Sequence, residues 1–323
     1  MSPVGSAEGA GPGPVFSVVI PTWNRLEALP EVLAALEDQA WAPPFEVIVV
    51  DDGSEDGTWE WLSGRSFRCP IRAERQPNRG PAAARNRGVA LAGGQRVAFL
   101  GDDTVPGADW LYLHERAWRR REDDRPIAVL GYTRWHRRLP RTRFMEYINE
   151  HGPQFGYRLI RDPEEVAFQL FYTSNLSVDR ELLLEEPFHE GFPAAAWEDA
   201  ELGYRLQERF DLRIVYEPRA VVEHDHPSDP ARFRRRQRAV GASAPVMYRL
   251  HPELGPMLKV GPGGPAPLSW APARWLRGAL VRALQYLPLW TPRLWQRTLD
   301  DGYLEGLWRS WREEPMVPEG ELR

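Results

Sequence analysis

Four short strand-like runs alternate with helix-forming segments in the first hundred residues, and this alternation constrains the fold more than any other feature. Three of the runs are apolar, Phe16 to Ile20, Val47 to Val50 and Val97 to Leu100, and Ile71 to Glu74 is a weaker strand. They suit strands, and the segments between them predict helices near Leu26 to Gln39, Asp56 to Leu62 and Ala82 to Ala92. Such an alternation predicts right-handed crossovers and a parallel, doubly wound α/β sheet.

Polar residues follow three of these strands. They are Pro21-Thr22-Trp23-Asn24, Asp51-Asp52-Gly53-Ser54 and Gly101-Asp102-Asp103. Ligands of open α/β sheets bind beyond the carboxyl ends of the strands. Taken alone, Asp102 and Asp103 are more typical of a polar turn after a strand than of a ligand site. Asp51 and Asp52 taken alone are explained by helix capping and turn formation. The three ends together favour a ligand site, in which the carboxylates suit Mg²⁺ or Mn²⁺ on a diphosphate.

The second half of the chain is less regular. We predict a helix over Pro106 to Arg120, strands over Ile127 to Tyr132, Leu170 to Val178, Arg213 to Tyr216 and Val221 to Asp225, and a helix from Trp197 to Leu206. Glu198 and Asp199 suit the first turn of that helix because of its dipole. Alternation places His224 and His226 on one face of their strand, a spacing that allows metal binding.

Two segments are rich in arginine. Arg134 to Arg143 carries five arginines and a histidine, which favours a solvated face, with a grip on an anionic acceptor as the alternative. Residues 229–250 predict a basic helix, in which Arg232 to Arg238 is mostly arginine.

The C-terminal segment from Ser269 to Trp311 is rich in Trp, Leu and Arg. Prolines at 272, 288 and 292 predict that it breaks into short helices. Such amphipathic helices lie on an anionic membrane or dock on protein, either this chain or a second copy, and docking is the commoner case. We therefore divide the chain into a disordered tail (1–14), a catalytic domain (15–250), a Pro/Gly linker (251–268) and a helical appendage (269–323).

Composition narrows the functional classes. The 323 residues are 42% hydrophobic, which is enough for a substantial core. A net charge of −5 gives no electrostatic case for nucleic acid, so we expect no such partner. The single Cys69 rules out an internal disulfide and a Cys-rich zinc site. No apolar run approaches the ~18 residues of a membrane span, so we expect a cytoplasmic protein that is soluble or peripheral to the membrane.

Six motifs in sequence resemble the GT-A fold, family 2 glycosyltransferases. They are Val-Val-Ile-Pro-Thr-Trp-Asn-Arg at 18–25, Val-Val-Asp-Asp-Gly-Ser at 49–54, Asn-Arg-Gly-Pro-Ala-Ala-Ala-Arg-Asn-Arg-Gly at 78–88, Phe-Leu-Gly-Asp-Asp-Thr-Val-Pro at 99–106, Thr-Ser-Asn-Leu-Ser-Val at 173–178 and Glu-Asp-Ala-Glu-Leu-Gly-Tyr-Arg-Leu at 198–206. The resemblance covers about 16–226. It implies a Rossmann-like, mostly parallel sheet with a smaller mixed sheet.

The resemblance also implies roles for single residues. Thr22 and Trp23, with Pro21 and Arg85, are expected in the nucleotide-sugar pocket. Asp52 is expected to bind the base, Asp102 lies near the ribose, and Asp103 binds Mn²⁺ or Mg²⁺. Asp199 is expected to act as general base, and His224, or failing it His226, completes the metal shell. Many members have a third Asp where Gly101 stands here, which affects the ribose contact more than the metal.

The resemblance implies an inverting, metal-dependent glycosyltransferase. Its donor is a UDP-, GDP- or dTDP-sugar, and its acceptor is a saccharide, a lipid-linked glycan or a small molecule. A sugar nucleotidylyltransferase is the alternative enzyme, but it needs a Gly-rich, basic phosphate loop where Pro21-Thr22-Trp23-Asn24 stands. A non-catalytic nucleotide-sugar binding or assembly subunit is the alternative outside enzymes.

Overall fold

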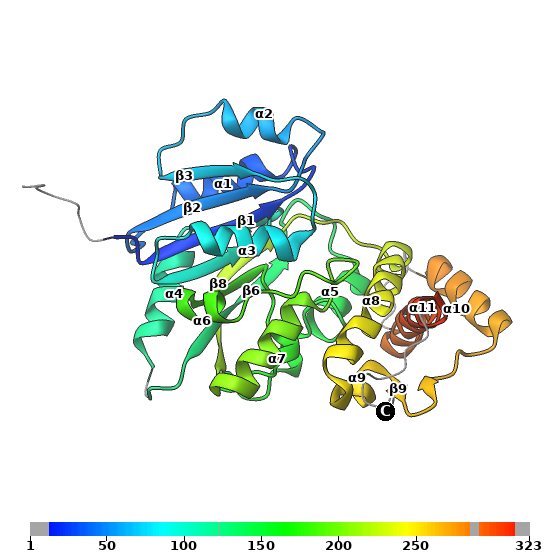
Figure 1. The fold of residues 1–323 in the computed structure, drawn as a ribbon. Coiled ribbons are helices and arrows are strands. Elements are labelled where there is room, and N and C mark those ends of the chain that lie inside the picture. The colour runs from blue at the N-terminus through cyan, green and yellow to red at the C-terminus, as the bar shows by residue number, and fades with distance from the viewer. Residues whose placement is uncertain (1–12, 122, 285–290, 314–323) are drawn as a thin grey trace, which may run out of the picture.

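A computed structural model of the chain describes residues 13–121, 123–284 and 291–313 (Figure 1). The predicted disordered tail lies outside this range, apart from Gly13 and Pro14. The same holds for the end of the predicted appendage, 314–323, and for Pro288.

The first half of the chain forms the predicted parallel sheet. Strands β1 (Phe16–Thr22), β2 (Phe45–Asp51), β3 (Ile71–Arg75) and β4 (Arg96–Leu100) are arranged in the order β3-β2-β1-β4. Phe16 is in register with both Phe45 and Arg96, so the carboxyl ends of the central strands meet at one edge. The predicted α/β alternation is confirmed.

Helices cover both faces of this sheet because its side chains alternate between two apolar layers. Val19 and Phe99 belong to the cluster that includes α3 (Pro81–Leu91) and α7 (Glu198–Phe210). Val18 and Ala98 belong to the cluster that includes α1 (Leu29–Glu37) and α4 (Trp110–Arg119). The short helix α2 (Thr58–Ser63) connects β2 to β3. Strands β1, β2 and β4 are therefore largely buried on both sides, as their apolar runs predict, whereas β3 lies at the sheet edge and is only partly buried.

The remaining strands extend the same sheet in mixed directions. These are β5 (Thr104–Pro106), β6 (Ile127–Trp135), β7 (Asn175–Asp179) and β8 (Arg213–His224), and the full order is β3-β2-β1-β4-β7-β6-β8-β5. β7 is antiparallel to β4 and β6, β5 is antiparallel to β8, and β6 is parallel to β8. The mixed part therefore continues the main sheet. A separate two-stranded antiparallel sheet pairs β9 (Val260–Gly261) with β10 (Gly264–Pro265).

Three predictions of local structure were wrong. The segment Pro106 to Arg120 begins at the end of strand β5, and its helix starts only at Trp110. In the segment Leu170 to Val178, the first residue belongs to a 3₁₀ helix, η2 (Phe168–Leu170), and the strand begins only at Asn175. Residues 172–175 form a turn instead, because the Asn175 N–H donates to the Tyr172 carbonyl. The strands predicted at 213–216 and 221–225 are one strand, β8, whose pairing with β6 shifts register beside Gly131.

Helices from the second half form a lobe beside the sheet. They are α5 (Arg143–Glu150), α8 (Pro230–Leu250), η3 (Pro252–Leu254), α9 (Gly255–Leu258), α10 (Ala271–Leu284) and α11 (Pro292–Glu313). The short helices η1 (Tyr157–Leu159) and α6 (Arg180–Glu185) instead pack in the core layer that contains α3 and α7. In Figure 1, α11 lies between α8 and α10, and α10 is at the outer edge of the molecule. Among the helices of the described ranges, none has both the length and the apolar character needed to cross a membrane.

α11 packs directly on α8 through glycine. A Cβ atom at Gly306 would overlap the carbonyl oxygen of Arg238, and one at Gly241 would overlap that of Tyr303.

The prediction that the C-terminal segment breaks into short helices was wrong, because α11 continues for 22 residues. Pro272 and Pro292 lie in first helical turns, where a missing N–H breaks no hydrogen bond.

Candidate active site

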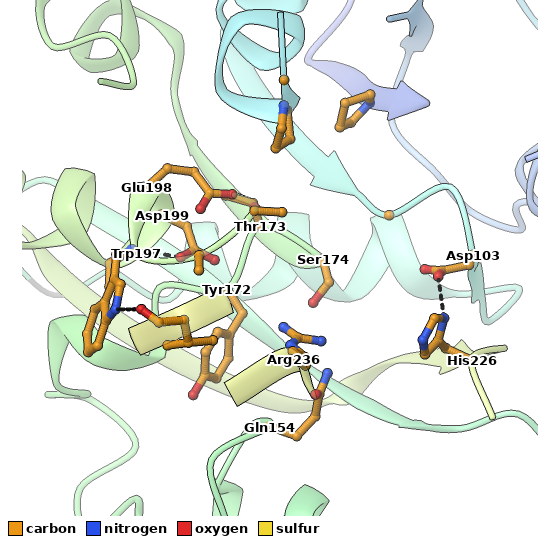
Figure 2. A pocket seen from close by; sticks show the side chains of 18 of the residues that line it. Asp103, Gln154, Tyr172, Thr173, Ser174, Trp197, Glu198, Asp199, His226 and Arg236 are labelled. Atoms are coloured by element: carbon orange, nitrogen blue, oxygen red, sulfur yellow. Dashed lines mark hydrogen bonds and ion pairs between the residues drawn. The ribbon is translucent and has the colours of Figure 1, made fainter. Parts of the chain in front are cut away.

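A cavity of about 1000 Å³ lies beyond the carboxyl ends of β1, β2 and β4. All of the residues predicted for the site line it: Pro21, Thr22, Trp23, Asp52, Arg85, Asp102, Asp103, Asp199, His224 and His226. They come from both halves of the chain, so the fold brings together residues up to 205 positions apart. Figure 2 shows Asp103 and His226 at one side of this cavity and Asp199 with Glu198 at the other.

The loop after β1 is tied to the loop after β2. The Asn24 backbone N–H donates to the Ser54 hydroxyl at 2.8 Å, and the Glu55 N–H donates to the Asn24 side-chain oxygen at 2.8 Å. Asn24 adopts a positive φ of 54°, which Asn tolerates better than most residues. Trp23, beside it, is 55% exposed while lining the cavity. The loop therefore presents a large flat side chain on a fixed backbone.

Asp52 organises the turn that follows β3. Its carboxylate accepts hydrogen bonds from the Arg79 and Gly80 backbone N–H groups at 2.9 and 2.8 Å, and from the Gln76 amide at 2.8 Å. Gly53, with φ at +80°, lets the two loops approach, since a Cβ there would lie 2.9 Å from the Asn78 nitrogen. Asp52 lines the cavity, but its oxygens already accept protein donors.

Arg25 lies against both acids of the Asp102-Asp103 pair. Its Nε is 3.4 Å from Asp102 Oδ1, and its Nη2 is 3.5 Å from Asp103 Oδ2. Burial and the Asp103 carboxylate raise the pKa of Asp102 to about 7, against the lowering effect of Arg25. The sequence analysis missed Arg25, although it directly follows the predicted Pro-Thr-Trp-Asn end of the first strand.

Asp103, His224 and His226 form a cluster suited to a metal ion. One ligand atom from each lies within 4.8 Å of the others. His224 Nε2 is 3.5 Å from Asp103 Oδ1, and His226 Nδ1 is 3.6 Å from Asp103 Oδ2. Burial alone would raise the pKa of Asp103, but contacts with the two histidines and Arg25 hold it well below its usual range. Both histidines therefore reach the carboxylate, as strand alternation predicts.

Pairing between β5 and β8 sets the position of this cluster. Thr104 lies opposite His224 in the ladder, and the Asp225 N–H donates to the Asp103 carbonyl at 2.8 Å. The Trp135 ring stacks on His224 with centroids 5.5 Å apart. His224 Nδ1 is buried and has no hydrogen-bond partner within the described residues, so this imidazole is anchored by packing.

The basic run 134–143 supports the cluster from outside the cavity. Arg134 pairs with Glu223 at 2.6 Å, and the Arg138 Nε donates to Asp225 at 2.9 Å. Of the side chains that the structure describes in this run, none lines the cavity. These arginines brace the end of β8, which carries His224, and Asp225 next to it. The alternative prediction, that this run binds an anionic acceptor in the cavity, does not match their position outside it.

Asp199 points into the cavity from the first turn of α7. Burial, followed by the charge of Glu198, raises the pKa of Asp199 to about 6. Arg85, the Ala200 N–H and Arg236 oppose this rise. Arg85 lines the cavity as predicted, but its Nη1 donates to Glu198 Oε1 at 2.9 Å, so its guanidinium is paired with an acid of the protein.

Trp197 connects α7 to α8. It has a positive φ of 74°, and its indole N–H donates to the Val240 carbonyl at 3.0 Å. An indole at this position can stack on a sugar face or contribute to a core. The Trp197 side chain is half-buried and lines the cavity, while its indole N–H is bonded to α8. Its position is therefore compatible with both roles.

The far end of the cavity is built by residues that the sequence analysis did not single out. Gln154, Tyr172 and Ser174 come from the loops before β7, and Arg236 and Gln237 come from α8. The C-terminal segment adds Met257, Lys259, Gln296, Asp300 and Tyr303. Lys259 and Asp300 form an ion pair of 2.9 Å. The basic character of 232–238 was visible in the sequence, but only the helix phase shows which arginine faces inward.

Gly101, which directly precedes Asp102 and Asp103, is closely packed. A Cβ there would lie 3.1 Å from the Thr104 hydroxyl and 3.4 Å from Asp103 Oδ1. A larger side chain at 101 would therefore require Thr104 to move. The two acids that remain both face the cavity.

Known proteins resemble this chain in sequence and in fold. The family model described as glycosyl transferase family 2 matches residues 17–172. Validoxylamine A glucosyltransferase of Streptomyces hygroscopicus subsp. limoneus is 31% identical over 217 residues, which is 60% of this chain and 48% of that protein. The pre-mycofactocin glycosyltransferase of Mycobacterium tuberculosis is 28% identical over 268 residues, 79% of this chain and 51% of the relative. The chain thus spans about half the length of these curated relatives.

A solved structure supports the architecture. The mannosyltransferase from Pyrobaculum calidifontis, in complex with GDP-Man and Mn²⁺, superposes with a TM-score of 0.59 at 19% identity, covering 92% of this chain and 88% of that one. At this identity the likeness concerns the fold. Together these comparisons show that residues 17–172, just under half of the chain, match glycosyl transferase family 2 and that the chain has the GT-A fold.

Proposed function

We propose that this chain is a metal-dependent, inverting glycosyltransferase that transfers a sugar from a nucleoside diphosphate sugar to an acceptor hydroxyl. One observation carries the proposal. The metal-type cluster of Asp103, His224 and His226 and the isolated acid Asp199 line a single cavity. The family match and the relatives named as glycosyltransferases support the same reaction class.

The donor occupies the end of the cavity next to β1 and β2. Trp23 offers a ring face for the base, and the buried Thr22 hydroxyl hydrogen-bonds to the Asp102 carboxyl and opposes the rise of its pKa. Asp52 shapes this wall through its bonds to the turn at 79–80, with capacity for a further donor from the base. Uracil, thymine and guanine all carry ring N–H donors for such a carboxylate.

The donor set fits Mn²⁺ better than Mg²⁺. Two imidazole nitrogens and one carboxylate suit a transition metal, whereas Mg²⁺ prefers oxygen ligands and keeps several waters. When bound, the cation supplies Lewis-acid neutralisation of the charge that develops on the leaving diphosphate. Asp103 and the two histidines hold it, and Arg25 adds a guanidinium at the same place.

Asp199 acts as the general base. With a pKa of about 6 its carboxylate is ionised at neutral pH and accepts the proton of the acceptor hydroxyl as the new C–O bond forms. The bond from the anomeric carbon to the diphosphate oxygen breaks in the same displacement, and the electron pair leaves with the nucleoside diphosphate. Because no protein nucleophile takes part, the anomeric configuration inverts.

The acceptor enters between the loops before β7 and the C-terminal lobe. The amides of Gln154, Gln237 and Gln296 face this part of the cavity, and the charges of Lys259 and Asp300 cancel in their ion pair. Neutral amides match the hydroxyl groups of a saccharide or polyol. We therefore place 15–250 as the catalytic domain and the segment after it as part of the acceptor wall.

Nucleotide-sugar turnover tests this function. The chain, with Mn²⁺ and a panel of UDP-, GDP- and dTDP-sugars, is expected to release nucleoside diphosphate, faster when a matching acceptor is present. Asp199→Asn should keep Mn²⁺-dependent donor binding, seen as a higher Tm with ligand, and lose transfer. Asp103→Ala should lose the Mn²⁺-dependent binding. Full turnover by Asp199→Asn would remove the base assignment, and a chain that binds donor without any turnover would be a binding subunit.

A further inference from the structure

The outward face of α10 is apolar and uncovered. Trp275 is 70% exposed, Leu276 62% and Leu280 43%, and Trp270, which directly precedes the helix, is 76% exposed. Positions 276 and 280 are one helical turn apart and lie side by side, whereas Trp275 is about 100° from Leu276 around the helix and borders the second cavity, so the exposed apolar face is broad. Large exposed apolar patches of this kind mark contact surfaces.

The inward face of α10 carries the charges instead. The Arg277 Nη2 lies 2.6 Å from Asp301 Oδ2, and the Arg274 Nε lies 3.3 Å from Glu305 Oε1, so two ion pairs attach α10 to α11. A surface helix normally buries its apolar stripe and exposes its charges. α10 buries Val281, partly buries these two arginines and leaves its bulkiest apolar side chains exposed, so they are available to an external surface.

A second cavity of about 400 Å³ lies beside this face, between α8, α10 and α11. Its charged lining consists of one carboxylate, Glu305, and five guanidinium groups: Arg234, Arg235, Arg238, Arg274 and Arg282. Arg234, Arg238 and Arg274 form ion pairs with Glu305, with nitrogen–oxygen distances of 2.6, 2.7 and 3.3 Å respectively. Arg235 and Arg282 are exposed and have no acidic partner in the part of the chain that the structure describes. The cavity is therefore strongly cationic.

The positive charge is segregated into this part of the chain. Residues 230–282 contain ten Arg and Lys residues against a single acid, Glu253, although the whole chain has a net charge of −5. The acids of the chain are concentrated elsewhere, so the cationic rim and the apolar face form a local surface with its own chemistry.

We propose that this surface, formed by the apolar face of Trp270, Trp275, Leu276 and Leu280 with the rim Arg235 and Arg282, binds an anionic phospholipid bilayer. The helix lies in the plane of the interface, its apolar face enters the headgroup region, and the arginines contact lipid phosphates. A second copy of the chain complements the surface less well. An isologous contact through the apolar face would bring two cationic rims together, whereas an anionic bilayer complements both charge and apolarity.

This docking would orient the reaction cavity. One side of α11 contributes Gln296, Asp300 and Tyr303 to the reaction cavity, and another contributes Thr298 and Glu305 to the cationic cavity. A chain bound through α10 therefore holds the acceptor end of its cavity close to the membrane. The membrane binding itself does not depend on the proposed transfer reaction.

Vesicle flotation tests the proposal. The chain is expected to float with vesicles of phosphatidylcholine mixed with phosphatidylglycerol, to stay behind with phosphatidylcholine alone, and to dissociate at high salt. The double variant Trp275→Ser/Leu276→Ser should lose binding. Arg235→Gln/Arg282→Gln should weaken it by about five-fold for each arginine removed. Trp41→Ser is the matched control, because Trp41 is 79% exposed but lies outside this lobe, and it should bind as wild type.

Two further measurements show whether a variant still folds and whether the chain self-associates. Each variant should keep the wild-type Tm and Mn²⁺-dependent nucleotide binding, which shows that the fold is intact. Failure of the wild-type chain to bind anionic vesicles would overturn the proposal, as would equal loss of binding in Trp41→Ser. A wild-type dimer in light scattering that Trp275→Ser/Leu276→Ser dissociates, without vesicle binding, would assign the surface to a second copy.

Discussion

Arg85 Nη1 lies 2.9 Å from Glu198 Oε1, and this ion pair stands next to the acid that we propose as the base. Glu198 raises the pKa of Asp199, whereas Arg85 lowers it. The pair therefore sets the proton affinity of Asp199 from outside the reaction path. Sequence motifs showed all three residues, but only the structure shows that Arg85 serves the acid.

The pH dependence of transfer follows from this arrangement. Asp199 must be deprotonated to act, so the wild-type kcat should rise with pH through about 6 and level off above it. Glu198→Gln removes a like charge and frees the positive charge of Arg85, which lowers the pKa of Asp199. The acidic limb of the kcat profile should move to lower pH, measured at saturating donor and Mn²⁺. An unchanged limb would exclude Asp199 as the titrating group.

Arg25 should compete with the cation for Asp102 and Asp103. Arg25→Gln is expected to bind Mn²⁺ in the absence of nucleotide about two- to five-fold more tightly, because a partly exposed ion pair contributes up to about 1 kcal/mol. Calorimetric titration with MnCl₂ measures this. Arg25→Lys keeps the charge and should resemble wild type. Weaker Mn²⁺ binding by Arg25→Gln would show that the arginine supports the cation site and does not compete with it.

Metal preference should depend on His226. Replacing this half-exposed imidazole with an oxygen ligand, in His226→Asn, is expected to lower turnover with Mn²⁺ and to reduce the ratio of Mn²⁺-supported to Mg²⁺-supported turnover. Chelation with EDTA should abolish turnover in both proteins. His189→Asn is the control, since His189 belongs to neither the cluster nor the cavity lining. An unchanged ratio would place His226 outside the metal shell.

The contact between α8 and α11 should be intolerant of a methyl group. Gly306→Ala would place its Cβ against the carbonyl of Arg238 and should destabilise the protein by about 1–3 kcal/mol or more. For a chain of this size each kcal/mol lowers the Tm by roughly 2 °C. Gly278→Ala is the matched control, because nothing lies within 4 Å of a Cβ there and alanine favours the helix. Equal Tm values for the two variants would contradict the packing described.

Local patterns predicted the parallel half of the fold because three of its four strands, β1, β2 and β4, are largely apolar runs. They failed where tertiary contacts decide. The pair Thr173 and Ser174 has strand-like alternation, but it lies in a cavity loop and pairing with β4 begins only at Asn175. Likewise β8 looked like two strands because its irregularity beside Gly131 depends on the partner β6.

The site was predictable where its chemistry is carried by contiguous motifs. Asp103 and Asp199 belong to such motifs, His224 was predicted from strand alternation and the family resemblance, and all three line one cavity. Arg236 and Gln296 reach the same cavity from helices whose sequences give only a basic or amphipathic pattern, so their position depends on helix packing. No local signal separates Arg236 from its neighbours in the run 232–238.

The bond from the Trp197 indole to the Val240 carbonyl has a practical consequence for anyone shortening this protein. Trp197 immediately precedes Glu198 and Asp199, and Val240 belongs to the helix on which α11 rests. A fragment trimmed after residue 250 for crystallisation would keep every acid of the centre yet remove the support behind them. Any turnover of such a fragment would then understate that of the 323-residue chain.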